Sequence, residues 1–100
     1  MTFESPVLRK AAKGRSCVKC GATENVVGCH YTGVRRLSYG GGYGIKVHDF
    51  LLAHLCGNCH REMDLLYRDK EKKWLHSEEF LHYIALTLTR LFEEGIVGVK

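Results

Sequence analysis

Two Cys-x-x-Cys pairs constrain the fold of this chain more than any other feature: Cys17 with Cys20, and Cys56 with Cys59. A turn of this type aims two sulfur atoms at one point about 2.3 Å from a metal, and two such turns complete a tetrahedron. The spacing therefore predicts a structural zinc site made of four thiolates. Because a chain of 100 residues buries only a modest core, we expect the metal to be part of the fold.

Length and composition predict one intracellular domain over residues 1–100. No stretch approaches the roughly 20 apolar residues of a membrane span, and the N-terminus lacks the apolar run of a signal peptide. We therefore expect a cytoplasmic protein with no membrane partner. In a reduced compartment Cys-x-x-Cys pairs are metal sites more often than disulfides, and no thioredoxin-like pattern supports a redox pair. The fifth cysteine, Cys29, is expected to be a small buried residue.

Positive charge is concentrated in the N-terminal half of the chain. Residues 1–48 contain eight basic and two acidic side chains, a net +6, whereas residues 49–100 contain seven basic and nine acidic ones, a net −2. This distribution favours nucleic acid as a partner, with a solvated basic surface as the alternative. The cations expected to bind it belong to a basic N-terminal arm, residues 1–16, or precede a glycine-rich stretch: Lys10, Lys13, Arg15, Arg35 and Arg36.

The middle of the chain predicts two strands around a glycine-rich connection. The apolar pair at 26–27 indicates a strand that ends at His30. Residues 39–44 contain four glycines and two tyrosines. This stretch favours either a flexible loop that contacts a phosphate backbone or bases, or a plain hairpin connection. Alternating apolar positions at 45–48 then predict a returning strand.

The last third of the chain is helical in pattern. Apolar residues spaced three and four apart predict a helix from about His60. A longer apolar stripe predicts a C-terminal helix over 77–94, with Ser77 as its N-cap. We expect this helix to pack on the core, with a dimer interface as the second option. His76 and His82 are expected at the surface.

Four residues carry the predicted chemistry. His30 is the candidate general base, because an imidazole titrates near neutral pH and can take a proton from water. His60 follows the last cysteine directly, and Asp64 lies four residues later on the same helix face, so the two can share a divalent ion. Asp49 is either a further ligand or the group that orients a histidine. Each also has a structural alternative. His60 could simply lie near the zinc, Asp64 could be a solvated carboxylate on the helix, and Asp49 could cap the segment that follows it.

These motifs together resemble a known family. A zinc pair, a strand ending in histidine, a glycine-rich connection and a second pair followed at once by histidine resemble the zinc-bearing HNH, or ββα-metal, nucleases. More narrowly, four segments resemble the YbcO-like nucleases encoded by prophages and phages: LRKAAKGRSC, CHYTG, HDFLLAHLCGNCHREMD and EEGIVG. The resemblance runs from about Leu8 to Val97. The CxxCH element alone is common, whereas its combination with the basic arm and CHYTG is far more specific.

The resemblance implies a small α+β, zinc-stabilised ββα-metal domain, treble-clef-like and closed by the C-terminal helix. It further implies a DNA endonuclease of the bacterial cytoplasm, which hydrolyses phosphodiester bonds with Mg²⁺ or Mn²⁺. By the same resemblance His30 matches the general base, His60 the metal-binding histidine and Asp64 an acidic position after CxxCH. Cys29 stands where most HNH enzymes carry an acidic residue or a second histidine, and Asp49 substitutes for the middle asparagine.

Two other functions remain open from the sequence. A non-catalytic zinc module that binds nucleic acid needs the basic half and the zinc but neither histidine. A protein-interaction adaptor would use the 77–94 helix instead. For the nuclease, a homodimer would allow both strands of a duplex to be cut at one place.

Overall fold

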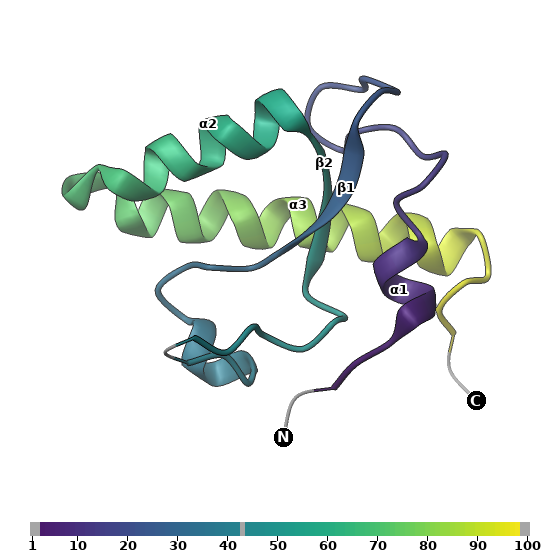
Figure 1. Cartoon of the computed structure of the whole chain (residues 1–100), viewed down its shortest axis with the longest axis horizontal. Coiled ribbons are helices and arrows are strands. Elements are labelled where there is room, and N and C mark those ends of the chain that lie inside the picture. Colours follow the sequence, from purple (N-terminus) through teal and green to yellow (C-terminus); the bar gives the residue numbers. More distant parts are fainter. Residues whose placement is uncertain (1–2, 43, 99–100) are drawn as a thin grey trace.

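The computed structural model describes residues 3–42 and 44–98, and its elements form an α+β arrangement (Figure 1). Two strands form an antiparallel pair, and the long C-terminal helix crosses behind them in this view. In chain order the elements are α1 (Pro6–Lys10), β1 (Val26–His30), the 3-10 turn η1 (Arg36–Tyr39), β2 (Leu52–Cys56), α2 (Gly57–Arg68), the 3-10 turn η2 (Lys70–Lys72) and α3 (Lys73–Glu93).

The first strand forms where the sequence predicts it, and it ends at His30. Its register pairs Val26 with Cys56 and His30 with Leu52. The two ends of the sheet therefore differ in chemistry: one end leads to the second cysteine pair, and the other end carries the candidate base.

The partner of β1 differs from the prediction. Within the described residues, 45–48 is not a strand and contributes only an isolated bridge between Gly42 and Ile45. The second strand is β2, and all five of its residues are buried. A strand covered on both faces has no apolar–polar alternation, so the pattern that predicts a half-buried strand does not detect it.

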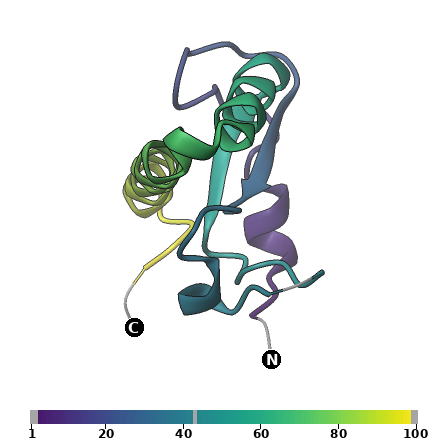
Figure 2. The same ribbon diagram turned by 90° about the vertical axis from the view of Figure 1, so that its left-hand side faces the viewer.

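Helices cover both faces of the strand pair, and Figure 2 shows α1 on one side and α3 on the other. Helix α1 begins after Ser5, whose Oγ accepts the Leu8 N–H at 3.2 Å. Ala11 and Ala12 follow this helix and are buried. From residue 3 onward, the predicted basic arm is thus folded against the sheet rather than extended from it.

The C-terminal helix begins four residues earlier than predicted, at Lys73, so Ser77 is not its N-cap. Turn η2 runs directly into the helix, and Ser77 is buried inside it, with its Oγ 2.5 Å from the Tyr31 hydroxyl. The early start also buries His76, which the sequence assigned to the surface. His82 is exposed, as predicted.

Aromatic rings link the helix to the strands. The Tyr31 ring meets the Phe80 ring edge-on, with centroids 5.5 Å apart. The His76 ring lies 5.0 Å from Tyr67 and 5.5 Å from Phe80. Cys29 is buried in the same core, as the sequence predicts. Among residues 3–42 and 44–98, no helix has both the length and the apolar character that crossing a membrane demands.

Candidate metal centre and histidine–aspartate pair

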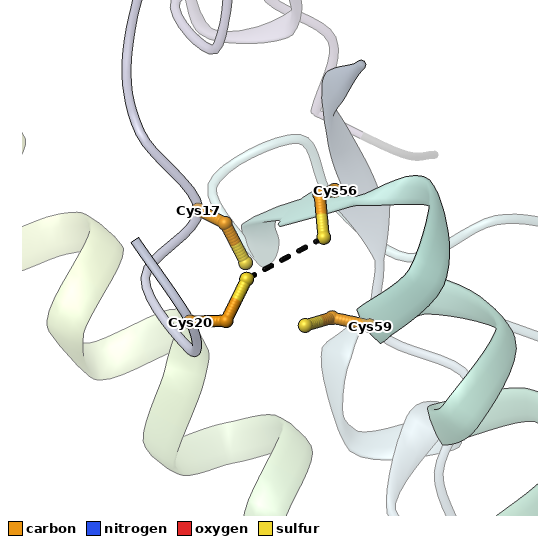
Figure 3. Close-up of side chains that lie close together, drawn as sticks. All are labelled: Cys17, Cys20, Cys56 and Cys59. Atoms are coloured by element: carbon orange, nitrogen blue, oxygen red, sulfur yellow. Dashed lines mark hydrogen bonds between the residues drawn. The ribbon is translucent and has the colours of Figure 1, made fainter. Parts of the chain in front are cut away.

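Four cysteines from distant parts of the chain converge at one end of the sheet (Figure 3). Their sulfur atoms all lie within 4.8 Å of one another, and Cys20 Sγ is 3.6 Å from Cys56 Sγ. A tetrahedron of four thiolates about 2.3 Å from zinc has sulfur–sulfur edges of about 3.8 Å. The members, Cys17, Cys20, Cys56 and Cys59, are therefore positioned to bind a metal ion, and none forms a disulfide.

Local backbone geometry builds this cluster. The first pair lies in a turn in which the Gly21 N–H donates to the Cys17 carbonyl at 2.9 Å, and Gly21 has a φ of 80°, which favours glycine. The Val18 N–H donates to the His54 carbonyl at 2.9 Å and so holds this turn on β2. Cys56 ends β2 and Cys59 lies in the first turn of α2. The strand-to-helix junction thus supplies the second pair.

Backbone N–H groups favour the thiolate form of Cys17. Burial alone would raise the pKa of this thiol, but the N–H groups of Cys20, Cys56 and Lys19 outweigh burial and lower the pKa to about 6. Metal binding requires the deprotonated form. An ion pair of 2.8 Å between Lys19 Nζ and Glu62 Oε2 links the first turn to α2.

Cys29 stands apart from this cluster. Burial, with a contribution from the charge of Asp64, raises the pKa of its thiol to about 12. Cys29 is therefore a neutral core residue at pH 7.

A second constellation joins His30 to Asp49. His30 Nε2 lies 2.8 Å from Asp49 Oδ1, and the other carboxylate oxygen, Oδ2, accepts the Ser5 N–H and Arg9 Nε–H, both at 2.6 Å. The Asp49 side chain is 1% exposed and the His30 side chain 15%. Of the two predicted roles of Asp49, orienting a histidine or binding a metal, the first agrees with its contact to His30.

These contacts keep Asp49 ionised. Burial would raise the pKa of its carboxyl group, but hydrogen bonds from His30, the Ser5 N–H and Arg9 outweigh burial and lower the pKa to about 2. The carboxylate is therefore a permanent hydrogen-bond acceptor at neutral pH. It can hold the His30 ring in one orientation.

His60 and Asp64 form a separate pair on α2. His60 Nε2 lies 4.0 Å from Asp64 Oδ2, and the side chains are 45% and 59% exposed. His30 contacts Asp49, whose other oxygen accepts from Ser5 and Arg9, so His30 points toward the segment that carries α1. In the described part of the chain, the four cysteines are the only group of three or more side chains placed to hold a metal. No group of three or more possible metal ligands in the described residues therefore includes His30 and His60.

The predicted nucleic-acid cations divide into two groups. Arg15 Nη2 pairs with Glu94 Oε1 at 2.8 Å, and the Arg35 guanidinium lies 5.3 Å from the centre of the Trp74 ring. For Lys10, Lys13 and Arg36, by contrast, no carboxylate of residues 3–42 or 44–98 lies within 4.0 Å.

Sequence reasoning missed Arg9 as a member of the histidine–aspartate site. Its partner, Asp49, is 40 residues away in the chain, and no local spacing indicates the contact. The charge balance of residues 1–48 pointed to the basic arm as a whole but did not distinguish a structural arginine from surface lysines.

Comparison with known proteins adds no family to these observations. No protein-family model matches the chain, and no curated protein or solved structure matches it. The fold and the site define an α+β protein with four cysteines placed to bind a metal ion and a buried aspartate that holds a histidine.

Proposed function

We propose that this protein is an endonuclease that hydrolyses phosphodiester bonds in DNA, with His30 as the general base. The observation that carries the proposal is the 2.8 Å contact between His30 Nε2 and Asp49 Oδ1. A partly exposed imidazole held by a buried carboxylate is the arrangement that general-base catalysis uses. The resemblance to HNH nucleases, which assigns the base to the same residue, agrees with it.

The chemistry follows from the tautomer that Asp49 favours. With a neutral ring, the Nε2–H of His30 donates to the ionised carboxylate, and Nδ1 carries the lone pair. Nδ1 can accept a proton from a water molecule as the water oxygen attacks phosphorus. The bond from phosphorus to the leaving 3′ oxygen then breaks, and that oxygen takes up a proton.

Zinc is the metal that we propose for the four cysteines. Four thiolates with tetrahedral spacing are the ligand set of structural zinc sites, and they leave no open position for substrate. The role of this zinc would be to hold the first cysteine turn on the end of β2 and the start of α2. It would do no chemistry.

The catalytic Mg²⁺ or Mn²⁺ of this proposal would be held by His60 Nε2 and Asp64 Oδ2, which lie 4.0 Å apart. Such an ion is usually held by one or two carboxylates together with substrate phosphates and water, so this pair is a partial site that DNA would complete. When bound, the ion would supply positive charge to the leaving oxygen. Asp49 is unsuited as a further ligand, because both of its oxygens already accept hydrogen bonds.

DNA binding is supported by exposed cations at the end of α1 and just after it. Lys10 ends α1, and Lys13 follows it by three residues. Helix α1 lies on the side toward which His30 points. Phosphate contacts by such cations position a strand without reading its sequence. Binding through them should weaken steeply with salt.

Nicking of supercoiled plasmid tests the proposal. Wild-type protein, with its zinc content measured, is incubated with and without added Mg²⁺ or Mn²⁺. His30→Gln is the informative variant, because the amide can still donate to Asp49 but cannot accept a proton. We expect at least a hundredfold loss of nicking, in line with the usual contribution of a general base. The control is His82→Gln, at an exposed position of helix α3. This variant should nick normally.

Undiminished nicking by purified His30→Gln would overturn the assignment of the base. Nicking that depends on added divalent ion and is lost in Asp64→Asn would support the α2 pair as its site. Nicking without any added ion, in protein that keeps only its zinc, would overturn the role of Mg²⁺ or Mn²⁺.

A non-catalytic zinc module that binds nucleic acid is the second candidate. The observation that favours it is that His30 contacts Asp49 whereas His60 pairs with Asp64, and no group of three possible metal ligands among the described residues includes both histidines. This function predicts salt-sensitive retention of DNA with no nicking under any divalent ion. A protein-interaction adaptor would instead show a tight protein partner and no DNA binding.

A further inference from the structure

A hollow of about 540 Å³ lies between residues 44–47 and helix α2. Among its walls are Arg36, Gly42, Ile45, Lys46, Asp64 and Tyr67. Its size falls in the range of sites that bind small molecules or single nucleotide units. The lining combines two cations, one carboxylate and apolar or aromatic surface, which suits a ligand with both a charged part and a flat apolar part.

The two cations of this hollow are available to a ligand. Within the described part of the chain, no carboxylate lies within 4.0 Å of Arg36 or Lys46. Lys46 is exposed and Arg36 half-buried. An arginine of this kind can bind a phosphate through two parallel hydrogen bonds.

Arg9 links the surroundings of this hollow to the histidine–aspartate site. A second, smaller hollow of about 340 Å³ is lined by Arg9 together with Ile45, Lys46 and Val47. The last three residues also line the first hollow, so one short segment separates the two. Arg9 Nε in turn donates to Asp49, the residue that holds His30. A ligand that crosses this segment would therefore reach Arg9, which contacts the carboxylate that holds His30.

We infer that the hollow binds one unpaired nucleotide of a DNA strand, with the neighbouring phosphate directed toward His30. The base would lie against Ile45 and Tyr67, and Arg36 and Lys46 would bind the backbone. A base within a duplex is stacked and paired and cannot enter such a hollow, so single-stranded DNA or an unstacked position is the fitting substrate. The direction of the phosphate rests on the proposed hydrolytic function; binding of the base does not.

Fluorescence anisotropy on three labelled ligands tests this inference: a 12-nucleotide single strand, the corresponding duplex, and a strand of the same length in which every nucleotide is abasic. All measurements use His30→Gln protein without added divalent ion, so that no ligand is cut. We expect the single strand to bind more tightly than either of the others. The loss on removing the bases should be about fivefold to a hundredfold, the contribution of one stacked base.

Gly42→Leu tests the position of the base. A Cβ at Gly42 meets no atom closer than Ile45 Cδ1 at 3.9 Å, and Gly42 does not have a positive φ, so the added side chain fits the backbone. Filling the hollow should lower the affinity for the single strand to that for the abasic strand and leave the latter unchanged. Gly98→Leu is the matched control, because a Cβ there meets nothing within 4 Å.

A double variant, Arg36→Gln with Lys46→Gln, tests the backbone contacts without altering the hollow's glycines. Each lost contact to a single-strand phosphate should lower the slope of log affinity against log salt by about 0.7. The control is Lys70→Gln with Lys72→Gln in η2, which removes the same charge outside the hollow.

The inference is overturned if Gly42→Leu binds the single strand as tightly as Gly98→Leu does, or if the duplex binds as tightly as the single strand. These outcomes are independent of catalysis. Base-dependent binding by a protein that never nicks DNA would leave the inference standing and would refute the nuclease. Nicking that is insensitive to Gly42→Leu would support the nuclease but refute the proposal that a base in the hollow directs the phosphate toward His30.

Discussion

Replacing Asp49 by asparagine tests the most tightly bound polar group of the described structure. The carboxylate accepts three hydrogen bonds of 2.6–2.8 Å, from the Ser5 N–H, Arg9 and His30. Asparagine has nearly the same shape but only one acceptor oxygen. Its NH₂ group must therefore face at least one of the three donors, and the negative charge is lost.

The pKa of Asp49 gives the magnitude. Burial opposes ionisation, yet the hydrogen bonds lower the pKa from 3.8 to about 2. A difference of roughly 1.8 units at about 1.4 kcal/mol per unit corresponds to about 2.5 kcal/mol. Arg9 is half exposed and can recover solvation when its partner is lost, so we expect Asp49→Asn to cost about 2 kcal/mol.

Urea unfolding at pH 7 and a fixed zinc concentration measures this cost. Thermal unfolding gives a second readout, because a loss of about 2 kcal/mol should lower the melting temperature of a domain this size by about 8–16 °C. The control is Asp69→Asn, an exposed aspartate that accepts one backbone hydrogen bond, from Glu71, which should change stability by under about 0.5 kcal/mol. If Asp49→Asn is as stable as this control, the ion pair contributes nothing and the reasoning is wrong.

Three further perturbations follow from the same structure. Cys20→Ser should abolish stoichiometric zinc binding and unfold the protein by circular dichroism, because structural zinc contributes about 10–16 kcal/mol and a domain has only about 5–15 to lose; a folded, zinc-free variant would contradict this. Ser77→Ala should cost about 1–2 kcal/mol in urea unfolding, since the buried Tyr31 hydroxyl loses a 2.5 Å partner; no loss would show the contact to be unimportant. Burial lowers the pKa of His76, so below pH 6.5 the unfolded chain takes up a proton that the folded chain does not. The stability of the wild-type protein should therefore decrease as the pH is lowered. His76→Phe should remove up to about 1 kcal/mol of that fall between pH 7 and 5.5, and equal pH dependence of the two proteins would refute it.

Several contacts of the candidate site could be predicted from local spacing alone. A Cys-x-x-Cys turn fixes the direction of its sulfur atoms over four residues, so two turns predict a shared metal wherever the chain brings them. His30 at the end of a strand was predicted in the same way, from an apolar run of a few residues. The burial of Cys29 follows from its place in that strand.

The second strand and the buried histidine were not predictable by these means. Residues 45–48 alternate in polarity, but Leu52–Cys56 form the strand. The sequence of this strand does not alternate, because helices cover both of its faces. His76 lost its predicted exposure because η2 passes directly into α3, so the helix begins one turn early. Both differences arise from packing between elements, which no short window of sequence contains.

By itself, then, the sequence determined the metal-binding cluster, the strand that leads to His30 and the helical C-terminal part of the chain, because each depends on interactions within a few residues. Only the tertiary structure decided that Asp49 binds Arg9 and His30 and that Ser77 binds Tyr31. These contacts join residues that are distant in the chain, and which of them form depends on strand register and helix packing.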